Sequence, residues 1–144
     1  MNRPSYLSEP DDVVKVCLTS SRDATPKLLA KVKQVTKWCI KNSHWIIVGD
    51  AEGGDAAVIA YCNLVKYERI TVWGAEGRLK RGMSCGINRV TYAGYLKRDE
   101  ITVAQCHAYI VILQGNRSVR LNHTLEFAKQ LGKQIRVFKI KGTK

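Results

Sequence analysis

The sequence predicts an α/β domain in which helices cover both faces of a mostly parallel sheet of about five strands. Two observations lead to this prediction. Short β-branched runs alternate with longer segments of helical periodicity, and the short runs are apolar throughout, as in strands that are buried on both faces. Parallel strands of this kind are joined by right-handed crossovers. A chain of 144 residues suits one domain and needs no disulfide or metal for stability.

Strand and helix patterns alternate regularly through the first half of the chain. The first predicted helix has Thr25 as its cap and Pro26 in its first position. A second helical pattern covers residues 56–65. The predicted strands are 13–19, 45–49 and 69–73.

The second half of the chain is less regular. Residues 74–94 contain five glycines, and such a long connection is often functional or mobile. The elements predicted beyond it are a helix over 95–107, a strand over 108–113, a helix over 121–131 closed by Gly132, and a strand over 134–140. This order is typical of a Rossmann-like three-layer sandwich. We expect residues 1–12 to form a flexible N-terminal segment and residues 13–144 to form a single domain.

The charge and the cysteine content limit the classes of partner and cofactor that we expect. The 24 Lys and Arg residues exceed the 12 Asp and Glu residues, for a formal net charge of +12. This excess favours an anionic partner such as nucleic acid or a nucleotide, although a solubilising surface would also explain it. The five cysteines form no C-x-x-C pair, so we expect reduced thiols, no metal site and no other cofactor. A polar N-terminus and the lack of a long apolar run predict a cytoplasmic protein that contacts no membrane.

Three loops that follow predicted strands contain the candidate binding residues, because ligands of open α/β sheets lie beyond the carboxyl ends of the strands. Residues 19–23 offer hydroxyls and a guanidinium that suit a phosphate or a ribose hydroxyl. Residues 49–55 combine glycines with two aspartates that could hold ribose or base. Residues 114–124 open a helix with small polar side chains and arginines. Helix caps and solvated turns remain the alternative interpretation of all three loops.

These loops together resemble the SMF/DprA–LOG (SLOG) superfamily, and within it the short YspA-like members. Residues 19–22 correspond to the glycine-serine-arginine turn of that family, and residues 49–56 are similar to its G-G/D-A-x-G-A/G-D motif. Arg98 and Asp99 resemble its R-[ND] pair, and residues 132–135 its G-K-x-[IV] ending. Gly115, Ser118 and Thr124 match the intervening loop in part.

The resemblance implies a sensor or processing protein that binds a nucleotide or a nucleotide-derived small molecule. The family pattern implies that hydroxyls and Arg22 bind phosphate, that glycines allow close approach of the ligand, and that aspartates hold ribose or base. The expected ligand-binding residues are Thr19, Ser20, Ser21, Arg22, Gly49, Asp50, Gly53, Gly54, Asp55, Arg98, Gly115, Ser118 and Arg120.

Two other functions stay open at this point, as does homo-oligomerisation. A hydrolase of N-glycosidic bonds would need a carboxylate such as Asp50, Asp55 or Asp99, but the P-G-G-x-G-T-x-x-E signature of nucleotide-cleaving members is not intact, so enzymatic activity is undecided. A protein that binds single-stranded nucleic acid would use the basic residues between positions 66 and 98. Four aromatic residues interleave with them, namely Tyr67, Trp73, Tyr92 and Tyr95.

Overall fold

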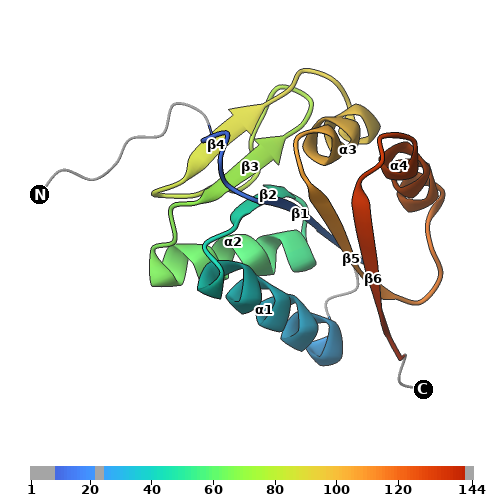
Figure 1. Ribbon diagram of the computed structural model, residues 1–144, viewed down its shortest axis with the longest axis horizontal. Coiled ribbons are helices and arrows are strands. Elements are labelled where there is room, and N and C mark those ends of the chain that lie inside the picture. The colour runs from blue at the N-terminus through green and yellow to red at the C-terminus, as the bar shows by residue number, and fades with distance from the viewer. Residues whose placement is uncertain (1–8, 22–24, 142–144) are drawn as a thin grey trace, which may run out of the picture.

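Six parallel strands form a single sheet in the computed structural model, which describes residues 9–21 and 25–141. Four helices connect them, except that a segment without a helix joins β3 to β4 (Figure 1). The elements are β1 (Lys15–Ser20), α1 (Pro26–Lys41), β2 (Trp45–Gly49), α2 (Gly54–Val65), β3 (Ile70–Gly74), β4 (Ile87–Val90), α3 (Tyr95–Ala104), β5 (Ala108–Gln114), α4 (Val119–Gln130) and β6 (Gln134–Ile140).

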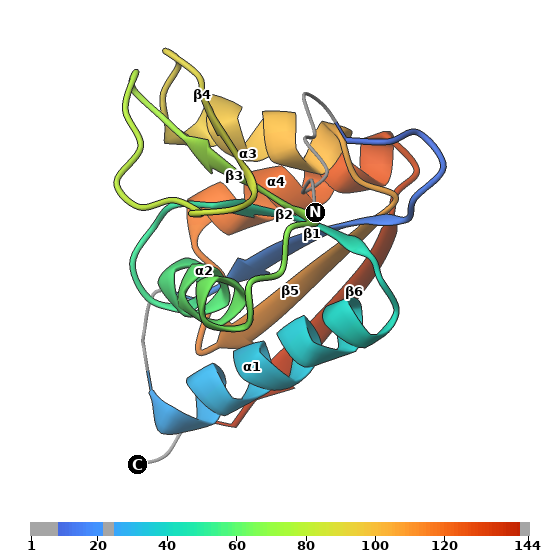
Figure 2. The same cartoon turned by 90° about the vertical axis from the view of Figure 1, so that its left-hand side faces the viewer.

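The strand order is β4-β3-β2-β1-β5-β6, and each neighbouring pair is parallel. Helices α1 and α2 cover one face of the sheet, and α3 and α4 cover the other (Figures 1 and 2). The order of the strands reverses between β1 and β5. The predicted α/β architecture of Rossmann-like type, with three layers, is therefore confirmed.

The sheet contains one strand more than the sequence predicts. Strand β4 lies inside the glycine-containing segment and pairs with β3, with Val72 opposite Asn88. It was missed because it has only four residues, of which Ile87 alone is buried. Helix α3 also ends at Ala104, earlier than expected, because His107 already pairs with β1: its N–H donates to the Lys15 carbonyl at 2.8 Å.

Two apolar layers, one on each side of the sheet, form the core. Successive residues of β1 alternate between them, so that Val16 and Leu18 pack under α1 and α2 while Cys17 faces α3 and α4. Trp45 is fully buried on the second side and donates its indole N–H to Thr71 Oγ1 at 2.9 Å. No helix in the described part of the chain combines the length and the apolar character that a membrane crossing requires.

A buried arginine connects the carboxyl ends of β2 and β3 to α3. Arg98 is only 1% exposed, and its Nη1 donates to Asp50 Oδ1 at 2.9 Å and to the Trp73 carbonyl at 3.0 Å. Its Nε donates to Asp99 Oδ1 at 2.9 Å. A Cβ atom on residue 49 would lie 2.8 Å from the Arg98 Cζ, so the guanidinium requires the glycine at this position.

The same network positions the loop after β3. The second oxygen of Asp50 accepts a hydrogen bond from the Lys80 backbone N–H at 2.7 Å, and the Asp50 carbonyl accepts one from the Arg81 side chain. The Asp50 carboxylate therefore accepts from one buried charged group and from one backbone N–H. Leaving such a charge unpaired costs several kcal/mol.

Replacing Asp50 should destabilise the protein severely. We expect Asp50→Ala to lower the free energy of unfolding by about 3–5 kcal/mol, because Arg98 would stay buried with Asp99, which it shares with Arg120, as its remaining carboxylate partner. Urea denaturation followed by circular dichroism measures this change. The control Glu52→Ala removes a carboxylate from an exposed position in the same loop and should change stability by no more than about 0.5 kcal/mol. Equal midpoints for the two variants would contradict the assigned role of the ion pair.

Candidate functional site

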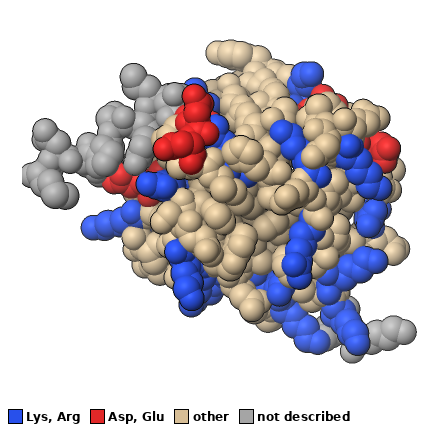
Figure 3. Space-filling view, viewed as in Figure 1, with Lys and Arg blue, Asp and Glu red and all other residues tan. Residues whose placement is uncertain are grey.

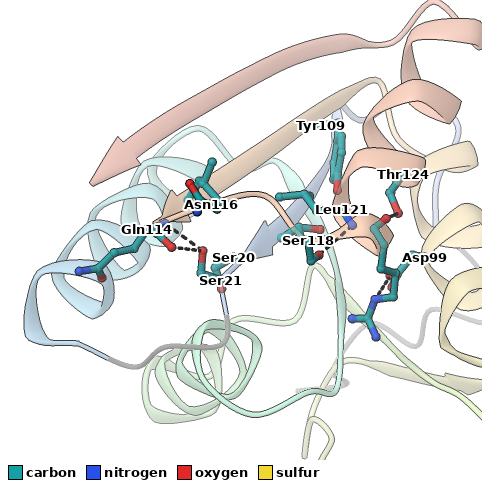
Figure 4. Close-up of a pocket in the computed structure, with 12 residues that line it drawn as sticks. Ser20, Ser21, Asp99, Tyr109, Gln114, Asn116, Ser118, Leu121 and Thr124 are labelled. Atoms are coloured by element: carbon teal, nitrogen blue, oxygen red, sulfur yellow. Dashed lines mark hydrogen bonds and ion pairs between the residues drawn. The ribbon is translucent and has the colours of Figure 1, made fainter. Parts of the chain in front are cut away.

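A cavity of about 380 Å³ opens beyond the carboxyl ends of β1 and β5 (Figure 4). It forms because the chain leaves these two strands toward opposite faces of the sheet, to α1 after β1 and to α4 after β5. The described lining consists of Thr19, Ser20, Ser21, Asp99, Tyr109, Leu113, Gln114, Asn116, Ser118, Arg120, Leu121 and Thr124.

Ser21 and Thr25 attach the floor of the cavity to the end of β5. The Ser21 backbone N–H donates to the Ile112 carbonyl at 3.0 Å, and its hydroxyl accepts from the Gln114 N–H at 2.8 Å. Thr25 caps α1 as predicted, accepting from the Leu28 N–H at 3.2 Å, and donates to the Gln114 side chain. These two hydroxyls are therefore occupied by protein contacts.

Tyr109 carries a buried hydroxyl without a described partner in the wall of the cavity. The residue is 0% exposed, and its oxygen has no hydrogen-bond partner among the described residues. Burial raises the pKa of the phenol well above its usual range; the nearby Thr19 hydroxyl opposes this rise without reaching hydrogen-bond geometry. In Figure 4 the hydroxyl points toward Leu121 and Ser118. Because an unsatisfied buried hydroxyl costs about 1–3 kcal/mol, this is the position where a ligand would gain most from a hydrogen bond.

The amino end of α4 borders the cavity from the other side. Gly115 turns the chain with a φ of +81°. A Cβ atom there would meet nothing within 4 Å, so glycine is favoured by the backbone conformation and not by lack of space. Ser118 then caps the helix by accepting from the Leu121 N–H at 3.0 Å. The remaining N–H groups of a first helical turn favour an anion, as does the helix dipole.

Asp99 lies in the cavity wall between two arginines. Its Oδ1 is 2.9 Å from Nε of Arg98, and its Oδ2 is 3.0 Å from Nε of Arg120. Both carboxylate oxygens are thus engaged, and the two arginines are balanced by Asp99 and by Asp50, the buried partner of Arg98. The ring of Tyr95 lies close to Arg120 and to Lys80. The Arg120 Cζ is 5.8 Å and the Lys80 Nζ 4.9 Å from the ring centroid.

The glycine loop over residues 49–55 faces the protein itself. A Cβ atom on Gly54 would lie 1.6 Å from the Ser20 Oγ, so this glycine lets the start of α2 approach the end of β1. Gly53 has a φ of +82°. The Asp55 carboxylate accepts from the Ala51 N–H at 3.2 Å, and burial raises its pKa to about 6, against the opposing influence of Arg98.

The structure thus assigns the predicted site residues to groups with different roles. The buried network contains Gly49, Asp50 and Arg98, and Gly54 and Asp55 lie beside Ser20. Gly53 and Gly115 turn the chain with positive φ. Arg22 lies outside the described residues. The cavity brings together Thr19, Ser20, Ser21, Asp99, Ser118 and Arg120.

Two cavity residues, Tyr109 and Leu113, lie outside the three loops and the other candidates that the sequence indicated. Tyr109 sits in an apolar strand, where an aromatic residue resembles ordinary core, and its hydroxyl was the one available signal. Four others belong to the indicated loop over residues 114–124 but were not among the expected ligand-binding residues, namely Gln114, Asn116, Leu121 and Thr124. No group of three or more His, Cys, Asp or Glu side chains within residues 9–21 and 25–141 is arranged to hold a metal ion.

Comparison with known proteins relates the fold to one solved structure. No family model and no curated protein matches the sequence. The fold is similar to that of DNA processing protein A from Helicobacter pylori, a protein reported to bind single-stranded DNA, with a TM-score of 0.68 and 14% sequence identity over 86% of this chain. The match spans 64% of that protein's chain. At this identity the likeness shows a shared fold.

Replacing Asp55 should change how stability depends on pH. An unfolded aspartate titrates near pH 3.9, whereas burial raises the pKa of Asp55 to about 6. The folded state therefore binds this proton more tightly, so the contribution of Asp55 to stability is largest below about pH 4 and is lost as the pH rises toward 6.

In Asp55→Asn this decline should be absent. Between about pH 4 and pH 6 the free energy of unfolding of the wild type should therefore fall by about 1–3 kcal/mol relative to that of the variant. Free energies of unfolding from urea titrations across the window measure it. The exposed Glu52→Ala variant should follow the wild-type curve. Parallel curves for wild type and Asp55→Asn would show that the carboxyl is not perturbed.

Proposed function

We propose that the chain binds a nucleotide or a nucleotide-derived ligand in the cavity beyond β1 and β5. One observation carries the proposal: a cavity at the reversal of strand order contains a buried hydroxyl, that of Tyr109, with no partner among the described residues. Nucleotides bind at this position of open α/β sheets because helix N-termini and strand ends converge there. The volume of about 380 Å³ is near the lower end of the range for small-molecule sites and suits a single nucleotide.

The chemistry of the lining suits the parts of a nucleotide. The amino end of α4 and the Arg120 guanidinium would receive a phosphate. The hydroxyls of Ser20 and Tyr109 would bond ribose, and Leu113 and Leu121 would provide an apolar wall for the base. We do not extend the proposal to bond cleavage, because both oxygens of Asp99, a carboxylate in the lining, are held by arginines.

Two substitutions test the cavity with adenosine monophosphate as the probe. Arg120→Ala should weaken binding by about 1.5–3 kcal/mol, the value of a charged hydrogen bond. Tyr109→Phe should weaken binding by about 0.5–1.5 kcal/mol while leaving the free energy of unfolding equal or higher, because it removes a buried hydroxyl that lacks a partner. Calorimetric titration and urea denaturation measure the two effects.

The matched control is Arg117→Ala, which removes an exposed arginine from the loop before α4, outside the described lining. It should leave binding nearly unchanged. Equal affinity of wild type, Arg120→Ala and Tyr109→Phe for adenosine monophosphate would refute the proposed site.

A second candidate function is binding of single-stranded nucleic acid. It is favoured by the net charge of +12, by the fold shared with a DNA-binding protein, and by the basic side chains around Tyr95. Lys80 and Arg120 lie against the ring of Tyr95 at the edge of the cavity wall, so that a strand seated in the cavity could continue across this aromatic side chain.

Salt dependence tests this candidate. Each phosphate contact on a single strand contributes about 0.7 to the slope of log affinity against log salt concentration. Lys80→Ala should therefore reduce the slope for an oligothymidylate by about 0.7, the contribution of one phosphate contact. Its affinity for adenosine monophosphate should not change. Lys129→Ala removes one lysine from an exposed position of α4 and serves as the control. An unaltered slope in Lys80→Ala would exclude this path for the strand.

A further inference from the structure

A groove of about 290 Å³ runs between α1 and β6, away from the cavity described above. Its lining combines the apolar residues Val35, Ile110 and Phe138 with Lys31 and Trp38 of α1 and Arg136 of β6. Strand β6 is an edge strand of the sheet, so that no further strand in the described part of the chain covers this side of the groove. None of these residues belongs to the described lining of the cavity.

The two elements beside the groove carry positive charge alone. Helix α1 contains five lysines, β6 contains Arg136 and Lys139, and neither contains an Asp or a Glu. In Figure 3 basic side chains gather over the lower part of the molecule, where α1 lies, whereas the acidic ones lie in the upper half of the view. A second copy of this chain would bring the same charge to the surface and be repelled, so the charge favours a polyanion.

The aromatic side chains distinguish the kind of polyanion. Trp38 is 49% exposed, although large apolar side chains are usually buried. Phe138 is held between two cations, with the Lys31 Nζ 4.3 Å and the Arg136 Cζ 4.8 Å from its ring centroid. An exposed indole in the same groove as two cations matches a partner that alternates flat bases with phosphates, which is the chemistry of single-stranded nucleic acid.

We propose that the α1–β6 groove is a separate binding surface for single-stranded nucleic acid, with phosphates at Lys31 and Arg136 and a base stacked on Trp38. This surface lies outside the cavity and away from the Tyr95 ring, and the inference does not depend on either of them. A strand could thus be held on the α1 side of the sheet while the cavity remains free for a single nucleotide.

The test measures anisotropy of a fluorescein-labelled oligothymidylate on the whole chain. Trp38→Ala should weaken binding by about fivefold to 100-fold, the effect of losing one base stack, whereas Trp38→Phe should retain most of the affinity. The double variant Lys31→Ala and Arg136→Ala should lower the salt slope by about 1.4.

A charge-matched control comes from the same helix. Lys33 and Lys37 lie on the side of α1 that faces α2, with their Nζ atoms 5.6 and 5.9 Å from the Tyr61 ring centroid. Replacing both with alanine removes two charges but leaves the groove intact, so the salt slope should change much less. Adenosine monophosphate binding, measured in parallel, should stay unchanged in every groove variant, which separates a failure of this inference from a failure of the cavity.

Three results would overturn the inference. The first is unchanged oligonucleotide affinity and salt slope in both Trp38→Ala and the Lys31, Arg136 double variant. The second is a shift from dimer to monomer in sedimentation of Trp38→Ala with oligonucleotide affinity retained, which would make the groove a contact between copies. The third is loss of binding to phosphatidylserine vesicles in the same variants with oligonucleotide affinity retained, which would make the partner a membrane surface.

Discussion

The buried ion pair between Arg98 and Asp50 is the interaction on which the arrangement of the candidate site depends. A guanidinium that is 1% exposed must have its donors satisfied, and the Asp50 carboxylate, the Trp73 carbonyl and Asp99 accept from it. Through Asp99 the network continues to Arg120 on α4, so that one wall of the cavity is connected to the ends of β2 and β3. The site is therefore supported from the interior of the protein.

Some of the residues near the strand ends support the fold, and others are available to a ligand. Gly49 and Gly54 bring segments of the chain close to Arg98 and Ser20, which is the close approach that glycines permit, but the approaching group is protein. The cavity instead presents hydroxyls and the amino end of α4. A site of this kind binds through hydrogen bonds and a helix dipole more than through free charge, and its affinity should depend only weakly on salt.

The positive charge of the chain is distributed elsewhere. Basic side chains surround Tyr95 on α3, and others border the groove between α1 and β6 beside Trp38. In both places cations lie next to an aromatic ring, an arrangement that suits a chain of phosphates and bases better than a single small anion. The two proposed modes of binding, one for a nucleotide and one for a strand, thus use different physical interactions and can be separated by salt.

The sequence by itself determined the fold class, because apolar runs and helical periodicity are local patterns. Five strands, the Thr25 cap and the turn at Gly132, with a φ of +73°, followed from such patterns. Only the tertiary structure decided that Asp50 and Arg98, 48 positions apart, neutralise each other, and that Tyr109 buries a hydroxyl without a partner among the described residues in the wall of a cavity. The short strand β4 likewise exists through its pairing with β3. These features depend on which distant segments meet, and a local pattern of residues does not contain that information.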